Sequence, residues 1–130
     1  MSGFCTLDTG ILISLDRGDP TVSATLRRFT DTGWVPVVPS VVVAEAWRDP
    51  RQVGLARALR HSSVVTLDDS IARRAGELNG RARLDDPVDA VVVVTAAERG
   101  GVLLTSDPDL AVLVDHLPPG GPPLLLRRPV

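Results

Sequence analysis

Short apolar runs alternate with longer amphipathic stretches along the chain. The runs are rich in valine and leucine, and three of them are followed directly by Asp or Pro, which is typical of buried strands. The first of them, FCTL, stops directly at Asp8. The pattern predicts five strands, at residues 4–7, 34–38, 63–67, 102–105 and 124–127.

Helical spacing is found between the predicted strands. In the clearest case Ile71, Ala75 and Leu78 share one face, and Asp68 is placed to cap the helix. Ser40 is likewise expected to be an N-cap. The pattern predicts helices at about 9–15, 22–31, 41–48, 51–60, 69–81, 88–98 and 108–116.

The segment 88–98 has features of both strand and helix. Its five valines and one threonine favour a strand by propensity. Against this, Asp86-Pro87 is a typical helix start, Gly100-Gly101 is a typical stop, and the length is helical. We therefore expect a buried helix.

Strands that alternate with helices predict an α/β fold with a central, mainly parallel five-stranded sheet flanked by helices. The 130 residues fit a single domain over residues 1–130, because they suffice for one hydrophobic core. In such sheets ligands bind at the carboxyl ends of the strands, near the point where the strand order reverses. Chemistry is therefore expected at residues that directly follow strands.

Composition narrows the classes of function. All 14 basic residues are arginine, which excludes a Walker A loop, a lysine Schiff base and a phospho-receiver site. Arginine suits phosphate, although the net charge of −2 does not mark a nucleic-acid binder. Cys5 lies in an apolar run and is expected in the core. Because no stretch could span a membrane and no signal-peptide pattern opens the sequence, we expect a soluble, cytoplasmic protein.

Four acidic residues fall where the predicted fold concentrates chemistry. Asp8 and Asp107 directly follow strands, Asp89 opens the buried helix, and Glu45 lies in the helix after the second strand. In a parallel sheet all four would project toward one edge. Two carboxylates about 4 Å apart repel by roughly 1 kcal/mol in water, and by more in a partly buried site. A divalent cation offsets this repulsion, and oxygen ligands without a His or Cys cluster select Mg²⁺ or Mn²⁺.

Helix capping is the alternative interpretation for three of these acids. Asp8, Asp89 and Asp107 all lie at or near the start of a predicted helix, where a carboxylate accepts backbone hydrogen bonds or suits the helix dipole. Glu45 resists that explanation. It lies in mid-helix within an apolar segment, where a buried charge needs a partner, and Arg48 is the only local candidate. Spacing alone leaves both interpretations open.

The four acids also carry a resemblance to a known family. Their motifs are LDTG with Asp8, PSVVVAEAW with Glu45, DPVDAVVVVTAAERGG with Asp89 and LLTSDPDL with Asp107, in this order over almost the whole chain. The sequence resembles the PIN-domain nucleases and, among them, the VapC-type toxins of bacterial toxin–antitoxin pairs.

This resemblance implies a metal-dependent endoribonuclease in which Asp8, Glu45, Asp89 and Asp107 gather around one or two Mg²⁺ or Mn²⁺ ions and hydrolyse RNA. It also implies a homodimer and inhibition by a cognate antitoxin whose C-terminal segment covers the active site. Asp8 and Asp107 are the predicted direct ligands, and Asp89 is a ligand directly or through water. Glu45 is predicted to orient the attacking water or accept its proton.

Several neighbours of the acids follow from the same resemblance. Thr105 and Ser106 match small polar residues that precede the fourth acid and could hydrogen-bond a carboxylate or a bound water. Asp86 and Asp109 are extra acids, interpreted as supporting or capping residues. Gly10 departs from the family, which often has Ser or Asn there, so one polar contact is expected to be missing. A catalytically silent PIN fold that binds RNA or protein is the alternative function, and the complete quartet argues against it.

RNA binding is expected to depend on arginine, because four aromatic residues among 130 argue against a base-stacking platform. A solvated helix face is the alternative role for these arginines and stays open. Trp47 and the early helices are candidates for a dimer or antitoxin surface, with a core position as the alternative for Trp47. The arginines form two groups: Arg48, Arg51, Arg57 and Arg60, and then Arg73, Arg74, Arg81 and Arg83.

Overall fold

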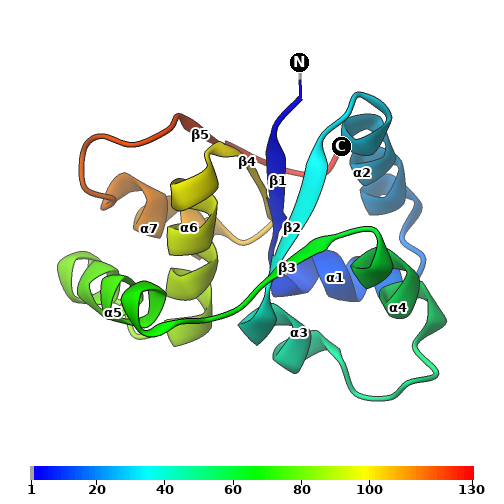
Figure 1. Ribbon diagram of the computed structural model, residues 1–130, viewed down its shortest axis with the longest axis horizontal. Helices are drawn as coiled ribbons and strands as arrows, with labels where there is room; N and C mark the ends of the chain where they lie inside the picture. The colour runs from blue at the N-terminus through cyan, green and yellow to red at the C-terminus, as the bar shows by residue number, and fades with distance from the viewer. Residues whose placement is uncertain (1) are drawn as a thin grey trace.

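A parallel sheet forms the centre of the computed structural model, which describes residues 2–130 (Figure 1). Its order is β3-β2-β1-β4-β5, and every pair of neighbouring strands is parallel. The predicted α/β fold with a five-stranded parallel sheet is confirmed. The strands are β1 (Phe4–Leu7), β2 (Val35–Pro39), β3 (Ser63–Val65), β4 (Gly101–Leu104) and β5 (Leu124–Arg127).

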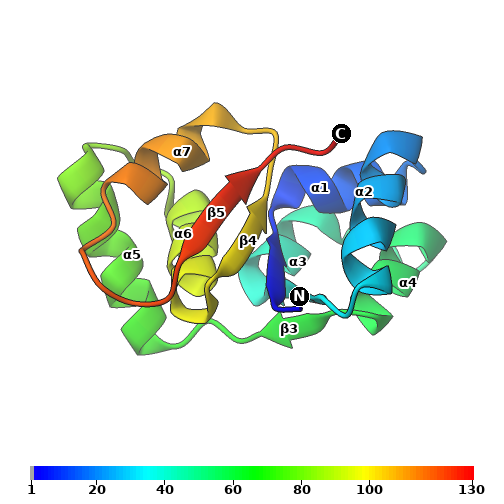
Figure 2. The same cartoon turned by 90° about the horizontal axis from the view of Figure 1, so that it is seen from above.

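Helices cover both faces of the sheet. One layer contains α1, α2 and α4, and the opposite layer contains α5, α6 and α7, as Figure 2 shows from above. Helix α3 contacts both α1 and α6. No helix within residues 2–130 is long and apolar enough to cross a membrane. The helices are α1 (Thr9–Asp16), α2 (Pro20–Asp31), α3 (Ser40–Ala46), α4 (Val53–Arg60), α5 (Asp69–Ala82), α6 (Pro87–Arg99) and α7 (Pro108–Asp115).

Helix α6 is the predicted buried helix, and its assignment is confirmed. Residues 90–96 are all buried, where α6 packs against the sheet and α5. This burial overrides the strand propensity of its valines. At its start, Asp86 Oδ1 accepts a hydrogen bond from Asp89 N at 3.0 Å, and Gly100 ends it at φ +71°.

The strand order reverses between β1 and β4. The chain builds β1, β2 and β3 outward and then returns to place β4 on the other side of β1. Leu7 pairs with Leu104, so Asp8 and Thr105 leave the sheet in register. Residues that follow these two central strands therefore meet at the switch point of the sheet.

Two predicted details around α3 are wrong. Ser40 is the first residue of the helix and not its cap, because its Oγ accepts a hydrogen bond from Leu67 N at 3.1 Å. Helix α3 ends at Ala46, and α4 begins only at Val53. Between them lies a turn in which the Gln52 side chain binds backbone N–H groups that would otherwise extend a helix.

Candidate active site

Asp8 is buried at the carboxyl end of the central strand β1, with 5% of its surface exposed. It follows β1 and caps α1, where its Oδ1 accepts a hydrogen bond from Ile11 N at 3.0 Å. Its other oxygen, Oδ2, accepts a hydrogen bond from Thr105 Oγ1. Asp8 therefore does cap a helix, as the alternative interpretation predicted, but it uses only one of its two carboxylate oxygens for this.

The Thr105 hydroxyl links Asp8 to Asp107. Besides donating to Asp8, it accepts a hydrogen bond from Asp107 N at 3.0 Å. Thr105 is itself held by β5, because its backbone N donates to Arg127 O at 2.9 Å. Asp107 caps α7 through its Oδ1, which accepts from Asp109 N at 2.9 Å. One hydroxyl thus fixes two acids that are distant in sequence.

Asp89 approaches the same acids from α6. Burial raises the pKa of Asp89 to about 7, and the charges of Asp86, Asp107 and Asp8 contribute to this rise. Burial also raises the pKa of Asp8, against the hydrogen bond from Thr105, and the charge of Asp107 adds to the rise. Asp8 and Asp107 are linked through Thr105, and Asp89 lies near enough for their charges to contribute to its raised pKa. We call these three residues the acid cluster.

Glu45 is exposed, and the prediction of a buried charge at this position is wrong. The prediction that Arg48 pairs with Glu45 is also wrong, because the Arg48 guanidinium donates to two nearby backbone carbonyls instead. The carboxylate is held by Thr9, whose Oγ1 donates to Glu45 Oε1 at 2.6 Å. Glu45 is therefore tethered through the residue that follows Asp8, beside the acid cluster and not packed within it.

Thr9 is the site residue that sequence reasoning did not single out. Its one signal was its place directly after Asp8 in LDTG, and its partner Glu45 is 36 residues away. At the next position, a Cβ added to Gly10 would lie 3.7 Å from Asp8 Oδ1. A side chain at position 10 would thus contact Asp8, and Gly10 has no side chain to make this contact.

The remaining predicted neighbours have unequal roles. Asp86 caps α6 and contributes charge that raises the pKa of Asp89. Asp109 is exposed and contacts Asp107 through its backbone N–H. Ser106 is exposed and makes no side-chain hydrogen bond within residues 2–130. Asp86 is therefore the neighbour with a direct electrostatic effect on the acid cluster.

The donor set of the acid cluster fits a hard divalent cation. Its members offer only oxygen, which Mg²⁺ and Mn²⁺ prefer, and a cation would relieve the repulsion between them. Within residues 2–130, no three His, Cys, Asp or Glu side chains are placed so that they could hold a metal ion as they stand. The three acids therefore offer suitable donor atoms but do not form a complete metal site in this structure.

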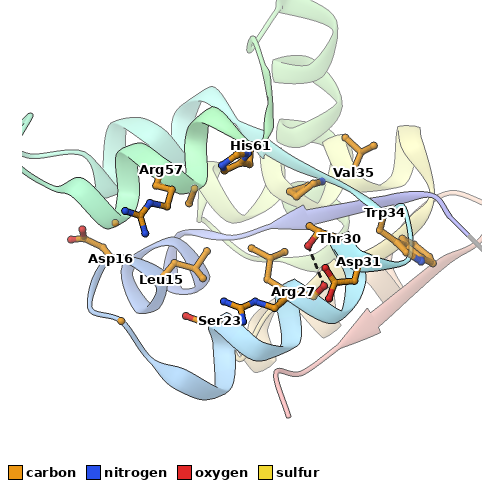
Figure 3. Close-up of a pocket in the computed structure, with 15 residues that line it drawn as sticks. Leu15, Asp16, Ser23, Arg27, Thr30, Asp31, Trp34, Val35, Arg57 and His61 are labelled. Carbon is orange, nitrogen blue, oxygen red and sulfur yellow. Dashed lines mark hydrogen bonds between the residues drawn. The ribbon is translucent and has the colours of Figure 1, made fainter.

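A large hollow lies apart from the acid cluster, between α1, α2, α4 and the start of β2 (Figure 3). Its volume is about 850 Å³, and none of the four predicted acids lines it. Apolar lining residues include Leu15, Leu26, Trp34 and Val35. Charged lining residues have both signs, namely Asp16, Arg27, Asp31 and Arg57. We call this hollow the helical-layer hollow.

Comparison with known proteins gives one family and a shared fold. Residues 5–115 match the PIN domain, and because this match covers most of the chain, the chain belongs to the PIN domain family. The predicted family is thereby confirmed, and PIN domains are typically nucleases. A comparison with curated protein sequences finds no match.

Two solved structures share the fold at low sequence identity. One is the crystal structure of VapBC2 from Rickettsia felis bound to a DNA fragment from their promoter, with a TM-score of 0.74 and 15% identity over 96% of this chain and 98% of that chain. The other is the structure of FitAB bound to an IR36 DNA fragment, with a TM-score of 0.62 and 14% identity over 94% of each chain.

Proposed function

We propose that the chain is a metal-dependent endoribonuclease and the toxin of a VapBC-type toxin–antitoxin pair. The observation that carries the nuclease proposal is the acid cluster at the switch point, where Asp8 and Asp107 share Thr105 and raise the pKa of Asp89. Carboxylates that repel one another in a partly buried site destabilise a fold unless they take up a proton or bind a cation. The fold likeness to chains of VapBC2 and FitAB supports the toxin proposal.

The side chains around the site have separable roles in this mechanism. A bound Mg²⁺ or Mn²⁺ supplies a water of lowered pKa and offsets charge on the phosphoryl oxygens. Asp8 and Asp107 would hold the ion, because Thr105 fixes their relative positions. Asp89 has a raised pKa of about 7 without a metal, and a bound cation would lower that pKa, so that Asp89 would hold the ion directly or through a water. Glu45 is held through Oε1 by Thr9, which leaves Oε2 to accept the proton of an attacking water.

Asp8→Asn tests this proposal because it keeps the size of the side chain and removes its charge. We expect Mg²⁺-dependent cleavage of an RNA oligonucleotide to fall at least about a hundredfold, a loss typical of removing one electrostatic contact to a transition state. Circular dichroism should show an unchanged fold. The control Asp115→Asn alters an exposed acid in the last turn of α7 and should cleave like the wild type. Full activity of Asp8→Asn would contradict the proposal.

A catalytically silent PIN fold is the competing function. The presence of all four acids, with three of them clustered, favours the enzyme. Thermal unfolding with and without Mn²⁺ separates the two functions. The enzyme should gain thermal stability with Mn²⁺ and lose that response in Asp107→Asn, whereas a silent module should show no response in either protein.

For the antitoxin partner, we propose that it binds at the helical-layer hollow. The apolar lining residues Leu15, Leu26 and Trp34 suit the apolar face of an amphipathic helix. The lining residues Arg57 and Asp31 offer charges of both signs to the polar side of such a helix. This hollow would hold one part of the antitoxin, and the antitoxin's C-terminal segment would extend from there to cover the acid cluster.

A further inference from the structure

A smaller hollow lies where the chain leaves β5 and crosses to α2, a path that Figure 2 shows from above. Its volume is about 300 Å³. Three of its lining residues are arginines, Arg28, Arg127 and Arg128, and no acidic side chain within residues 2–130 lines it. We call it the basic hollow. In a chain with a net charge of −2, such a concentration of positive charge marks a site for an anion.

The arginines of the basic hollow are available to a ligand. Arg127 and Arg128 are exposed, and neither forms an ion pair within residues 2–130. Arg28 uses its Nη2 to donate to Val130 O and Thr25 Oγ1, which fixes the direction of its guanidinium. One oriented and two unpaired guanidinium groups therefore surround the same space.

Most of the eight arginines that the sequence predicted for RNA binding already have protein partners. Three of the eight form ion pairs with acidic side chains, and two others donate to backbone carbonyls. The ion pairs are Arg51 with Asp49, Arg73 with Asp69 and Arg74 with Glu98, and the carbonyl contacts are those of Arg48 and Arg81. Surface charges that already have partners contribute less to binding a polyanion.

Strand β5 connects the basic hollow to the acid cluster. Arg127 is the last residue of β5, and its O accepts from the N of Thr105, which also holds Asp8. Beyond it, Thr25 Oγ1 binds both Val130 O at 2.7 Å and Val130 N at 3.1 Å, so residues 128–130 are fixed along α2. The segment from Arg127 to Val130 thus starts next to the acid cluster and leads from there to the basic hollow.

Aromatic side chains complete the basic hollow. Phe29 and Trp34 both line it, with ring centroids 5.4 Å apart in an edge-to-face arrangement. These are two of only four aromatic residues in the chain. Aromatic faces beside guanidinium groups suit the bases and phosphates of a single strand.

We infer that the basic hollow is a subsite for the backbone of single-stranded RNA. This inference rests on the proposed function, because it concerns the same substrate. Arg127 and Arg128 bind phosphates outside the position of cleavage, since arginine pairs bidentately with phosphate. An acidic peptide would meet the same charges, but the aromatic lining and the connection to the acid cluster favour nucleic acid.

The test measures RNA binding without cleavage. A fluorescently labelled, short single-stranded RNA of mixed sequence is titrated with protein in EDTA, and anisotropy is followed. Arg127→Ala/Arg128→Ala should weaken binding about tenfold and reduce the slope of log K against log salt by about 1.4, which corresponds to two lost phosphate contacts. Arg127→Lys/Arg128→Lys should keep most of the salt slope. The control Arg17→Ala/Arg27→Ala removes two exposed arginines that belong neither to the basic hollow nor to the two predicted groups, and it should bind nearly as the wild type does.

Cleavage is measured separately, so the two proposals can fail independently. If Arg127 and Arg128 are needed for binding but the wild type cuts no RNA, the proposed function fails and the subsite stands. Equal weakening in both alanine pairs, or unchanged binding in Arg127→Ala/Arg128→Ala, overturns the subsite whether or not RNA is cut. Tighter binding of a polyglutamate peptide than of RNA to the wild type also overturns it, because the hollow would then be a protein-docking site.

Discussion

Thr105 combines three contacts of the candidate site in one residue. Its hydroxyl donates to Asp8 and accepts from Asp107, and its backbone N–H binds β5. A carboxylate whose direction is fixed in advance loses little freedom when it binds an ion. The same hydrogen bond opposes the burial that raises the pKa of Asp8. Orientation and charge of the acid therefore depend on one hydroxyl.

Thr105→Val should lower cleavage about tenfold or more, as the loss of a residue that orients a metal ligand typically does. The hydroxyl lowers the pKa of Asp8, so its removal should raise that pKa and move the acid limb of the pH–rate profile to higher pH. Thr105→Ser keeps the hydroxyl and should restore both the rate and the profile. A Val variant that is slower but has an unmoved profile would show that Thr105 acts only through packing.

Asp89 makes stability depend on pH in a defined direction. Its folded pKa of about 7 lies above the ordinary value of 3.8, so the folded state holds the proton more tightly than the unfolded state does. This contribution is fully present below the ordinary pKa and is lost as pH rises through about 7. Asp89→Asn cannot titrate and should therefore be more stable than the wild type above neutral pH.

Urea unfolding in EDTA checks this prediction. The free-energy difference between Asp89→Asn and the wild type should widen from about pH 5 to about pH 8. Added Mn²⁺ should narrow the difference at the higher pH by stabilising the wild type alone. A difference that stays constant with pH would contradict the raised pKa.

At the scale of elements, local signals predicted α6 and failed around α3. Pro87 and Gly100 bound α6, and both act through the backbone, so no knowledge of the tertiary structure was needed. Ser40 has the chemistry of a cap, but its hydroxyl is used by Leu67, which lies beyond β3. Such a competing partner is set by strand pairing and cannot be recognised from neighbouring residues.

The same distinction explains which parts of the candidate site could be predicted. Asp8 and Asp107 follow strands that a parallel sheet brings together, so their convergence follows from the strand pattern. The apolar residues around Glu45 indicated burial, yet the side chain points to solvent and pairs with Thr9. That contact depends on how α1 packs against α3, which hydrophobic spacing does not determine.

The junction of β1 and β4 should tolerate no side chain at Gly101. This residue has φ +85°, and an added Cβ would lie 2.3 Å from Phe4 O. Gly101→Ala should therefore lower the free energy of unfolding by at least about 2 kcal/mol, through backbone strain and a displaced strand pair. The matched control is Gly76→Ala in α5, where an added Cβ meets nothing within 4 Å.

Gly76→Ala should raise the free energy of unfolding by up to about 1 kcal/mol, because alanine favours the helix and restricts the unfolded chain. Chemical denaturation of both variants gives the comparison. If the two variants had similar free energies of unfolding, the prediction would be wrong, and β1 and β4 could move apart at Gly101 without loss of stability.

At the scale of the whole molecule, three surfaces are distinct. The acid cluster lies at the sheet edge, the helical-layer hollow lies among α1, α2 and α4, and the basic hollow lies between β5 and α2. Trp34 is the one lining residue that the two hollows have in common within residues 2–130. Substrate binding, cleavage and partner binding should therefore respond to different substitutions.

Ala58→Arg should block the antitoxin and spare the enzyme. Ala58 is half-buried and lines the helical-layer hollow, so an arginine there would fill the space proposed for a partner helix. Co-purification with the cognate antitoxin should be lost while RNA cleavage is kept. Ala24→Arg adds the same charge at an exposed position of α2 outside that hollow, and it should retain the partner. Normal co-purification of Ala58→Arg would place the partner elsewhere.

The reversal of strand order also governs when activity can arise during synthesis. Asp8 emerges from the ribosome early, yet its neighbours Thr105 and Asp107 follow β4, one of the last strands to be made. A nascent chain that stops before Gly101 contains Asp8, Glu45 and Asp89 but has no β4 to complete the edge. Domains acquire long-range strand pairs only after both partners exist. The acids can therefore come together only after β4 has been synthesised and has paired with β1.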